Sequence, residues 1–136
     1  MESYQLLSYQ MRDIKNALTG VLNRVLLRYD VSPVMMFTLE LLLKHPEYIA
    51  MDIASEVGVT RGAITQLLDK MEKQGLVSRH PHPTSRRSLQ IRVTDQGHVL
   101  ANSVLNEYHE QIAKMFDVYS NDEIVTLSKL LSKLPL

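Results

Sequence analysis

Between residues 50 and 97 the hydrophobic pattern of the chain changes from helical to alternating and back to helical, and this order restricts the fold more than any other feature. Two short helical patterns come first. Gly58 lies in the turn between them, where glycine adopts a left-handed conformation without strain. Thr60 is a natural N-cap for the second helix, which is expected over 61–74. Its apolar stripe repeats at helical spacing and consists of Ile64, Leu67, Leu68 and Met71.

Two short segments with alternating apolar residues follow this helix, and both predict half-buried strands. They read "LVSR" (76–79) and "LQIRVT" (89–94). The sequence between them, "HPHPTSRRS", is too long for a two-residue hairpin turn, so a longer loop is expected. A helix–turn–helix that leads directly into a two-stranded hairpin is the winged helix-turn-helix arrangement.

Long helical patterns flank this region on both sides. Apolar residues at helical spacing predict one long helix over 4–28 and another over roughly 95–118. A helix over 33–44 is apolar on several sides, so we expect it in the middle of the fold. The sequence "SNDE" forms a capping box between Ser120 and Glu123 and starts the last helix.

The expected fold class is therefore mainly α (α+β): a winged helix-turn-helix with a two-stranded β-wing and long N- and C-terminal helices. We expect one domain over residues 1–136, in which residues 33–95 form the winged helix-turn-helix lobe. The terminal helices, 4–28 and 96–134, carry more apolar surface than such a lobe covers, so we expect them to serve dimerisation.

Net charge gives no indication of a partner, because fifteen Lys and Arg residues balance fifteen Asp and Glu residues. The distribution is uneven: residues 79–94 hold Arg79, Arg86, Arg87 and Arg92 and no acidic residue. Local charge sets the electrostatic potential within a Debye length, about 8–10 Å at physiological salt, so such a patch attracts phosphates even on a neutral protein. This pattern indicates a nucleic-acid partner.

Several chemistries are excluded by what the sequence lacks. There is no cysteine, which excludes a disulfide, a cysteine nucleophile and a thiol redox switch. No P-loop, HExxH, GxSxG or Gly-rich nucleotide motif occurs. Asp52 with Glu56, and Asp69 with Glu72, have the spacing of one helix face, but such pairs are typical of solvated surfaces. We therefore expect no enzymatic activity and no cofactor.

Metal and membrane partners are not expected either. His80 and His82 form an H-x-H pair on a proline-flanked loop without a nearby carboxylate or cysteine, which is an incomplete set of metal ligands. No apolar run approaches the roughly 18 residues of a membrane span. The first residues lack the pattern of a signal peptide, so a cytoplasmic location is expected.

Residues 53–97 resemble the MarR family of bacterial transcription regulators. The family pattern contains a Leu/Ile-Ala pair, a glycine turn, a recognition helix followed by Gly-Leu-Val, an arginine-bearing wing and a Thr-x-x-Gly exit from the second strand. The matching positions in this chain are Ile53-Ala54, Val57-Gly58-Val59-Thr60, Ile64-Thr65, Leu68, Glu72, Gly75-Leu76-Val77, Arg79, Arg87 and Thr94-x-x-Gly97. The resemblance covers nearly the whole chain and implies a DNA-binding regulator.

Three positions depart from the family pattern. Ser85 replaces the wing aspartate that, in the family, braces a basic side chain of the DNA-reading surface. Gln66 stands where the recognition helix often has Arg or His. Ala50 is the nearest residue to the Ser or Thr cap that usually starts the helix before the turn. We interpret these departures as changes of sequence preference or wing rigidity.

The exposed face of the 61–74 helix and the wing loop hold the candidate DNA contacts. Gln66 can pair with adenine in the major groove, and Arg61 can reach guanine or a phosphate. Arg87 occupies the wing-arginine position of the family and is expected in the minor groove, where the potential is most negative. The predicted contacts with double-stranded DNA are Thr60, Arg61, Gly62, Ala63, Thr65, Gln66, Lys70, Arg86 and Arg87.

In the family, the terminal helices of two chains interleave into a dimer. The resemblance therefore implies a homodimer whose recognition helices lie about 34 Å apart, one turn of DNA, and read an inverted repeat. The alternative is a bundle within one chain. The residues assigned to dimerisation are Leu7, Met11, Leu127, Leu130, Leu131 and Leu134.

The resemblance also implies a ligand response, with a small aromatic effector bound where the dimer helices meet the lobe. Tyr29, Met35, Met36 and Phe37 lie near this junction in the sequence, although apolar residues at helical spacing are more often core than pocket. The lack of cysteine excludes peroxide sensing.

The resulting hypothesis is a ligand-responsive, homodimeric repressor. The alternative is a winged-helix module or antirepressor that binds protein and not DNA; it predicts acidic or apolar residues on the exposed recognition face and a neutral wing.

Overall fold

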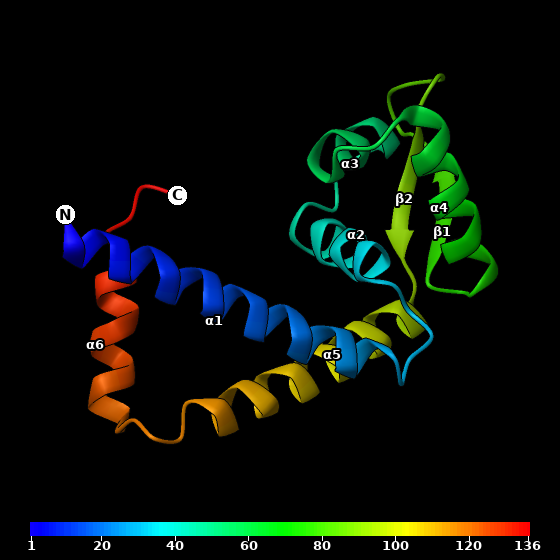
Figure 1. Ribbon diagram of the computed structural model, residues 1–136. Helices are drawn as coiled ribbons and strands as arrows, with labels where there is room; N and C mark the ends of the chain where they lie inside the picture. The colour runs from blue at the N-terminus through cyan, green and yellow to red at the C-terminus, as the bar shows by residue number, and fades with distance from the viewer.

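The computed structural model describes all 136 residues as six helices and one two-stranded antiparallel sheet (Figure 1). The order predicted from the sequence is confirmed. The elements are α1 (Glu2–Leu26), α2 (Pro33–Lys44), α3 (Ala50–Val57), α4 (Arg61–Lys73), β1 (Val77–Pro81), β2 (Leu89–Val93), α5 (Asp95–Met115) and α6 (Asn121–Leu131). None of the helices is both long enough and apolar enough to span a bilayer.

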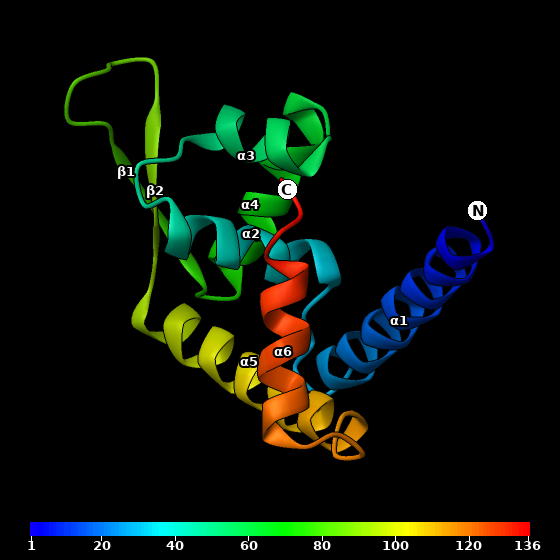
Figure 2. The ribbon, with the colours of Figure 1, turned by 90° about the vertical axis from the view of Figure 1, so that its left-hand side faces the viewer.

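The molecule consists of a compact lobe and a set of arm helices. Helices α2, α3 and α4 and the sheet form the lobe, whereas α1 and α5 pack against each other and extend away from it (Figure 1). Helix α6 follows α5 at the far end of the arm and is well separated from the lobe in Figure 1. The turned view shows the wing loop, between β1 and β2, extending beyond the rest of the lobe (Figure 2).

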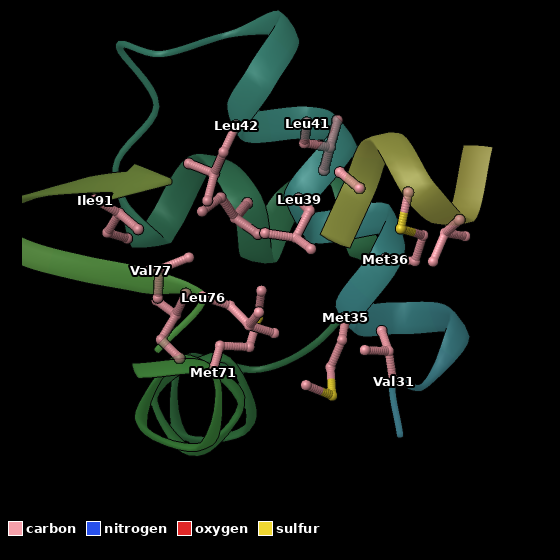
Figure 3. Close-up of a cluster of buried hydrophobic side chains, with 14 of the residues drawn as sticks. Val31, Met35, Met36, Leu39, Leu41, Leu42, Met71, Leu76, Val77 and Ile91 are labelled. Atoms are coloured by element: carbon pink, nitrogen blue, oxygen red, sulfur yellow. The ribbon is translucent and has the colours of Figure 1, made fainter. Parts of the chain in front are cut away.

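The hydrophobic core lies within the lobe and at its junction with the arms. As expected, α2 is central: its buried side chains are Met35, Met36, Thr38, Leu39, Leu41 and Leu42. Figure 3 shows Met35, Met36, Leu39, Leu41 and Leu42 of α2 in one cluster with Met71 of α4, Leu76, and Val77 and Ile91 of the sheet. Full burial of one such apolar side chain contributes about 1.5–3 kcal/mol to stability, so this cluster holds the helix–turn–helix against the sheet.

The strand register decides which side chains face the helices. Val77 pairs with Val93 and Arg79 pairs with Ile91. Directly opposed residues of an antiparallel pair project from the same face, so Arg79 shares a face with Val77 and Ile91, both of which are buried. Strand β1 packs against α4 on that face.

Several boundaries differ from the sequence-based expectations. Helix α1 ends at Leu26 and not at 28, because the chain turns into a left-handed residue, Asp30, at φ 52°. Helix α5 ends at Met115 and not at 118, and α6 ends at Leu131, so the predicted dimerisation residue Leu134 lies beyond the helix.

The predicted strand 76–79 in fact begins at Val77 and continues to Pro81. Leu76 is not in the ladder because its N–H closes the end of α4 by donating to the carbonyl of Met71 at 2.9 Å. Gly75, at φ 75°, makes this Schellman-type closure possible, since glycine adopts positive φ without a steric penalty.

Gly97 is the point of closest approach between α5 and the wing. Thr94 caps α5 by accepting a hydrogen bond from the Gly97 N–H at 3.0 Å. A Cβ at position 97 would lie 2.2 Å from the carbonyl oxygen of Leu76 and 2.8 Å from a methyl carbon of Val93. Only glycine therefore allows α5 to start where it does.

We expect Gly97→Ala to lower the free energy of unfolding by about 1–3 kcal/mol, the typical cost of overpacking, because the obstructing atom is backbone and cannot rotate away. Urea denaturation followed by circular dichroism measures this change. The matched control is Gly62→Ala, where the added Cβ meets nothing within 4 Å and helix propensity raises stability by up to about 1 kcal/mol. Equal stability of Gly97→Ala and the unmodified protein would contradict the packing argument.

Candidate nucleic-acid interface

Helix α4 is positioned by its cap and by one buried stripe. The Thr60 hydroxyl oxygen accepts a hydrogen bond from the Ala63 N–H at 3.2 Å, which fixes the first turn. Ile64, Leu68 and Met71 are fully buried against the core. The opposite face is exposed and contains the predicted contacts Thr60, Arg61, Gly62, Ala63, Thr65, Gln66 and Lys70.

The first turn of α4 is shaped for close approach by another molecule. A Cβ at Gly62 would touch no other part of the protein, so nothing in the fold requires glycine at this exposed position. Thr65 donates its hydroxyl proton to the carbonyl of Arg61 at 2.9 Å, which leaves its methyl group and its oxygen lone pair outward. These features suit a helix entering the DNA major groove, but the contacts themselves remain a prediction.

The two acidic side chains of α4, Asp69 and Glu72, are both bound by Arg79 of β1. Its guanidinium donates to the carboxylate of Asp69 and, from Nε at 3.1 Å, to Glu72. These hydrogen bonds, from Glu72 first and Asp69 second, raise the pKa of Arg79 above its usual value. Asp69 and Glu72 are both partly exposed, as expected of a surface pair, and in addition both hold α4 to β1 through Arg79.

The second acidic pair, Asp52 and Glu56, forms hydrogen bonds with residues just before α3. Asp52 accepts a hydrogen bond from the Ile49 N–H at 2.9 Å, and Glu56 accepts one from the Tyr48 hydroxyl at 3.1 Å. Residue Ile49, not Ala50, occupies the N-cap position of α3. Since isoleucine has no acceptor, no side chain caps the first N–H groups of this helix.

The wing turn is closed by a histidine, which sequence reasoning missed. Nδ1 of His82 accepts hydrogen bonds from the N–H groups of Thr84 and Ser85, at 3.2 and 3.1 Å. Side-chain acceptors of this kind usually come from Asp, Asn, Ser or Thr, so the pattern gave no signal for His82. The histidine was considered only as a metal ligand, and no group of three potential ligands surrounds it.

Ser85 does not take over the bracing role that the family gives to aspartate. Its hydroxyl donates to the Ser88 hydroxyl at 3.4 Å and contacts no basic side chain. Arg86 and Arg87 are both exposed, and neither forms an ion pair with an acidic residue. Their charges are therefore available to an external anion.

The structure brings Arg61 and Arg87 together. Both line a groove of about 290 Å³ between the N-terminal end of α3, the first turns of α4 and the wing. Figure 1 shows the wing loop at the same end of the lobe as the turn that leads into α4, the end remote from the arms. A recognition helix and a basic wing thus form one continuous surface.

Lys70 lies outside the groove that Arg61 and Arg87 line. It lies about 14 Å further along α4 than Arg61, given a rise of 1.5 Å per residue, and lines a different groove with Arg24 and Asp30 near the end of α1. If Lys70 contacts DNA, it does so at a separate phosphate.

The residues assigned to dimerisation lie on the arms with their apolar groups largely uncovered. Leu130 and Leu134 are 55% and 54% exposed, and α6 has no buried residue at all. Leu7, Met11 and Leu131 are also exposed, and Leu127 is half-buried. An open apolar groove of about 910 Å³ lies between α5 and α6, and Leu127 and Leu131 line it.

Of the four residues near the lobe–arm junction, two are core. Met35 and Met36 are almost completely buried, whereas Phe37 is 41% exposed. Tyr29 is half-buried and donates its hydroxyl proton to Glu107 of α5 at 2.8 Å, and Arg28 pairs with the same carboxylate. Tyr29 also lines a cavity of about 390 Å³ between the α1–α2 loop, the end of α4 and the start of α5.

Comparison with known proteins supports the resemblance seen in the sequence. The model of the MarR family matches residues 31–89, which include the helix–turn–helix and the first strand and loop of the wing. The HTH-type transcriptional regulator MhqR of Bacillus subtilis is 26% identical over 115 residues, covering 85% of this chain and 79% of MhqR. The HTH-type transcriptional repressor MdtR of the same organism is 25% identical over 107 residues, covering 79% of this chain and 69% of MdtR.

A solved structure gives the same fold. A MarR family protein from Bacillus stearothermophilus superposes with a TM-score of 0.89 at 23% identity, covering 97% of this chain and 92% of that one. The similarity thus includes the arms as well as the lobe. The family match, the related regulators and the shared fold together support a MarR-family winged helix-turn-helix transcription regulator.

Proposed function

We propose that the protein is a homodimeric, ligand-responsive repressor that binds an inverted repeat in double-stranded DNA. The observation that carries the proposal is the shared groove of Arg61 and Arg87, one on the recognition helix and one on the wing. Arg79 pairs with both acids of α4, whereas Arg61, Arg86 and Arg87 have no acidic partner, so the unpaired charges near this surface are positive. A surface of this kind attracts the DNA backbone and presents α4 to the bases.

On this proposal α4 enters the major groove by its N-terminal turns. Gly62 and Ala63 allow the helix backbone to approach the base edges, Gln66 pairs with adenine, and Arg61 reaches guanine or a phosphate. The wing loop lies over the neighbouring minor groove, where Arg87 inserts its guanidinium. Each good bidentate base contact discriminates against the wrong base by about 1–3 kcal/mol.

The arms support a second copy of the chain as the partner. Exposed apolar residues on α1 and α6 leave surface that a partner would cover, and a stable interface buries roughly 1,200–2,000 Å² in total. Two-fold symmetry then repeats α4 at a spacing of about one DNA turn. Repression is supported by MdtR, a relative that is named as a repressor, and by the simple fact that a bound dimer occludes the DNA it covers.

The protein-binding alternative is less well supported by the exposed surface. It predicts acidic or apolar groups on the outward face of α4, but Asp69 and Glu72 are paired with Arg79 and the wing carries two free arginines.

We expect selection from a random duplex pool to enrich an inverted repeat whose half-sites are about one turn apart. The affinity of the enriched duplex, measured by fluorescence anisotropy at 50 and 200 mM salt, should fall by a factor on the order of 10³ or more, because several phosphate contacts release counterions. A pool that remains random even at low salt would favour the protein-binding alternative.

We expect Arg87→Ala to weaken binding to the selected duplex and to reduce the slope of log K against log salt by about one unit, the share of one phosphate-neutralising cation. The control is Arg12→Ala, which removes an exposed arginine from α1 and should leave the slope unchanged. An unchanged slope in Arg87→Ala would exclude the wing from the DNA interface.

We expect the double substitution Leu130→Glu and Leu134→Glu to convert the dimer to a folded monomer, because two charges would be buried unpaired in the interface. Sedimentation velocity at micromolar concentration gives the oligomeric state, and circular dichroism checks that the helices remain. The control is Leu27→Glu, at a position 83% exposed and outside the dimerisation set, which should remain dimeric. If the unmodified protein sediments as a monomer, the assignment of the arms is wrong.

A further inference from the structure

The wing loop is held together by side chains and not by its own backbone. No backbone–backbone hydrogen bond joins two residues of 82–88, and Pro83 has no N–H to donate. Nδ1 of His82 instead accepts hydrogen bonds from the N–H groups of Thr84 and Ser85, at 3.2 and 3.1 Å. The Thr84 hydroxyl lies 3.3 Å from the same nitrogen. One ring nitrogen therefore organises the turn from residue 82 to residue 85.

A second turn follows directly and carries both wing arginines. Arg86 and Arg87 occupy its two central positions, between Ser85 and Ser88. The only hydrogen bond that closes this turn joins the Ser85 and Ser88 hydroxyls at 3.4 Å, which is long for an O–H donor. Figure 2 shows the loop extending beyond the rest of the lobe. The direction of the two arginines thus depends on Ser85, and the position of Ser85 depends on His82.

The contacts of His82 require a neutral ring. An imidazole nitrogen accepts a hydrogen bond only while it carries no proton, and a charged imidazolium donates from both nitrogens. The N–H groups of Thr84 and Ser85 can only donate, so a proton on Nδ1 would oppose two donors. Histidine is the side chain that ordinarily changes charge between pH 5 and 8.

The other wing histidine does not have this restriction. Nε2 of His80 lies 2.8 Å from the hydroxyl of Ser78, on the same strand. A hydroxyl can donate or accept, so this contact persists whether His80 is neutral or charged. His80 is therefore an internal control for His82.

No acidic side chain bonds to His82, so no ion pair competes with its two hydrogen bonds. The charged or titratable groups of the wing and of the groove beside it are all basic: Arg61, Arg79, His80, Arg86, Arg87 and Arg92. The acids of α4 bind Arg79, and those of α3 bind Tyr48 and the Ile49 N–H. Glu47, in the α2–α3 connection, pairs with His45 at 3.4 Å. Glu40 and Asp95, on α2 and α5, form no hydrogen bond with the loop.

We infer that His82 is a positioning residue of the wing: its neutral ring holds the turn that directs Arg86 and Arg87 toward DNA, and protonation of Nδ1 releases that turn. The effect on DNA rests on the function proposed above; the effect on the turn does not. Because the turn needs the neutral ring, it is held at the alkaline end of the imidazole range and lost as the pH falls. The contribution of the wing arginines to DNA binding should fall with it.

The turn is tested first without DNA. The full-length protein, labelled with ¹⁵N, is followed by NMR from about pH 8.5 to pH 5, through its histidine ring nitrogens and its backbone amides. At the alkaline end Nδ1 of His82 should carry no proton. The amide signals of Thr84 and Ser85 should then move with the same midpoint as the His82 ring. A proton on Nδ1 at the alkaline end, or amides that do not follow the ring, would overturn the inference.

The effect on DNA is measured as the loss of affinity for the selected duplex that Arg87→Ala causes, once at about pH 8 and once at about pH 5.5. Comparing these two losses cancels the direct attraction of a charged His82 for phosphate, which is present with and without Arg87. The loss should be about three- to tenfold smaller at the acidic pH, the worth of one neutral hydrogen bond. Equal losses at the two pH values would contradict the positioning role.

Three variants separate the proton from the structure. In His82→Asn the amide oxygen can accept from the same N–H groups at any pH, so the loss caused by Arg87→Ala should be large and independent of pH. In His82→Ala it should be small at both pH values, because no acceptor remains. His80→Asn is the matched control and should keep the pH dependence of the unmodified protein. A pH dependence that persists in His82→Asn, or disappears in His80→Asn, would assign the effect to another group.

Failure of this inference and failure of the proposed function give different results. If no duplex is bound at either pH, the proposed function fails, and the titration without DNA still decides whether His82 holds the turn. If DNA is bound and Arg87→Ala weakens it equally at both pH values, the proposed function stands and the role of His82 is wrong.

Discussion

The ionic contact between Arg79 and the acids of α4 is the interaction on which the DNA-facing surface depends. Strand β1 and helix α4 are joined by only a short turn, and the contact fixes their relative direction at a second point. It also offsets one of the two negative charges of α4, and the unpaired Arg61, Arg86 and Arg87 make the rest of this surface positive. One guanidinium therefore holds the helix against the strand and reduces its negative charge. The strand register explains why this arginine, and not Arg92, faces the helix.

Much of the fold follows from patterns that are local in sequence. The apolar stripe of Ile64, Leu68 and Met71 identified α4, and the positive-φ glycines at 58 and 75 identified both of its neighbouring turns. These signals are strong because each position has one physical requirement, burial or a left-handed backbone. Helix ends were less predictable. Met115 and Leu131 end their helices although the apolar periodicity continues beyond them, since periodicity does not record where a chain turns.

The exposed residues of the candidate site could be predicted from the sequence, but the contacts between side chains of different elements could not. The exposed face of α4 followed directly from the position of the buried stripe. Nothing in the sequence indicated that Arg79 would bind Asp69 and Glu72, because the partners belong to different elements and the contact depends on strand register. Likewise His82 closes the wing turn with a ring nitrogen, a role that turn statistics assign to other side chains.

The close contact of Gly97 with the Leu76 carbonyl leaves no room for a side chain between the start of α5 and the lobe. The helix continues for about 27 Å from Gly97 to its far end at Met115, at about 1.5 Å per residue. Any movement of the start of α5 relative to the lobe would have to displace this backbone contact as well. The absence of a side chain at residue 97 thus places the start of the arm directly against the backbone of the lobe.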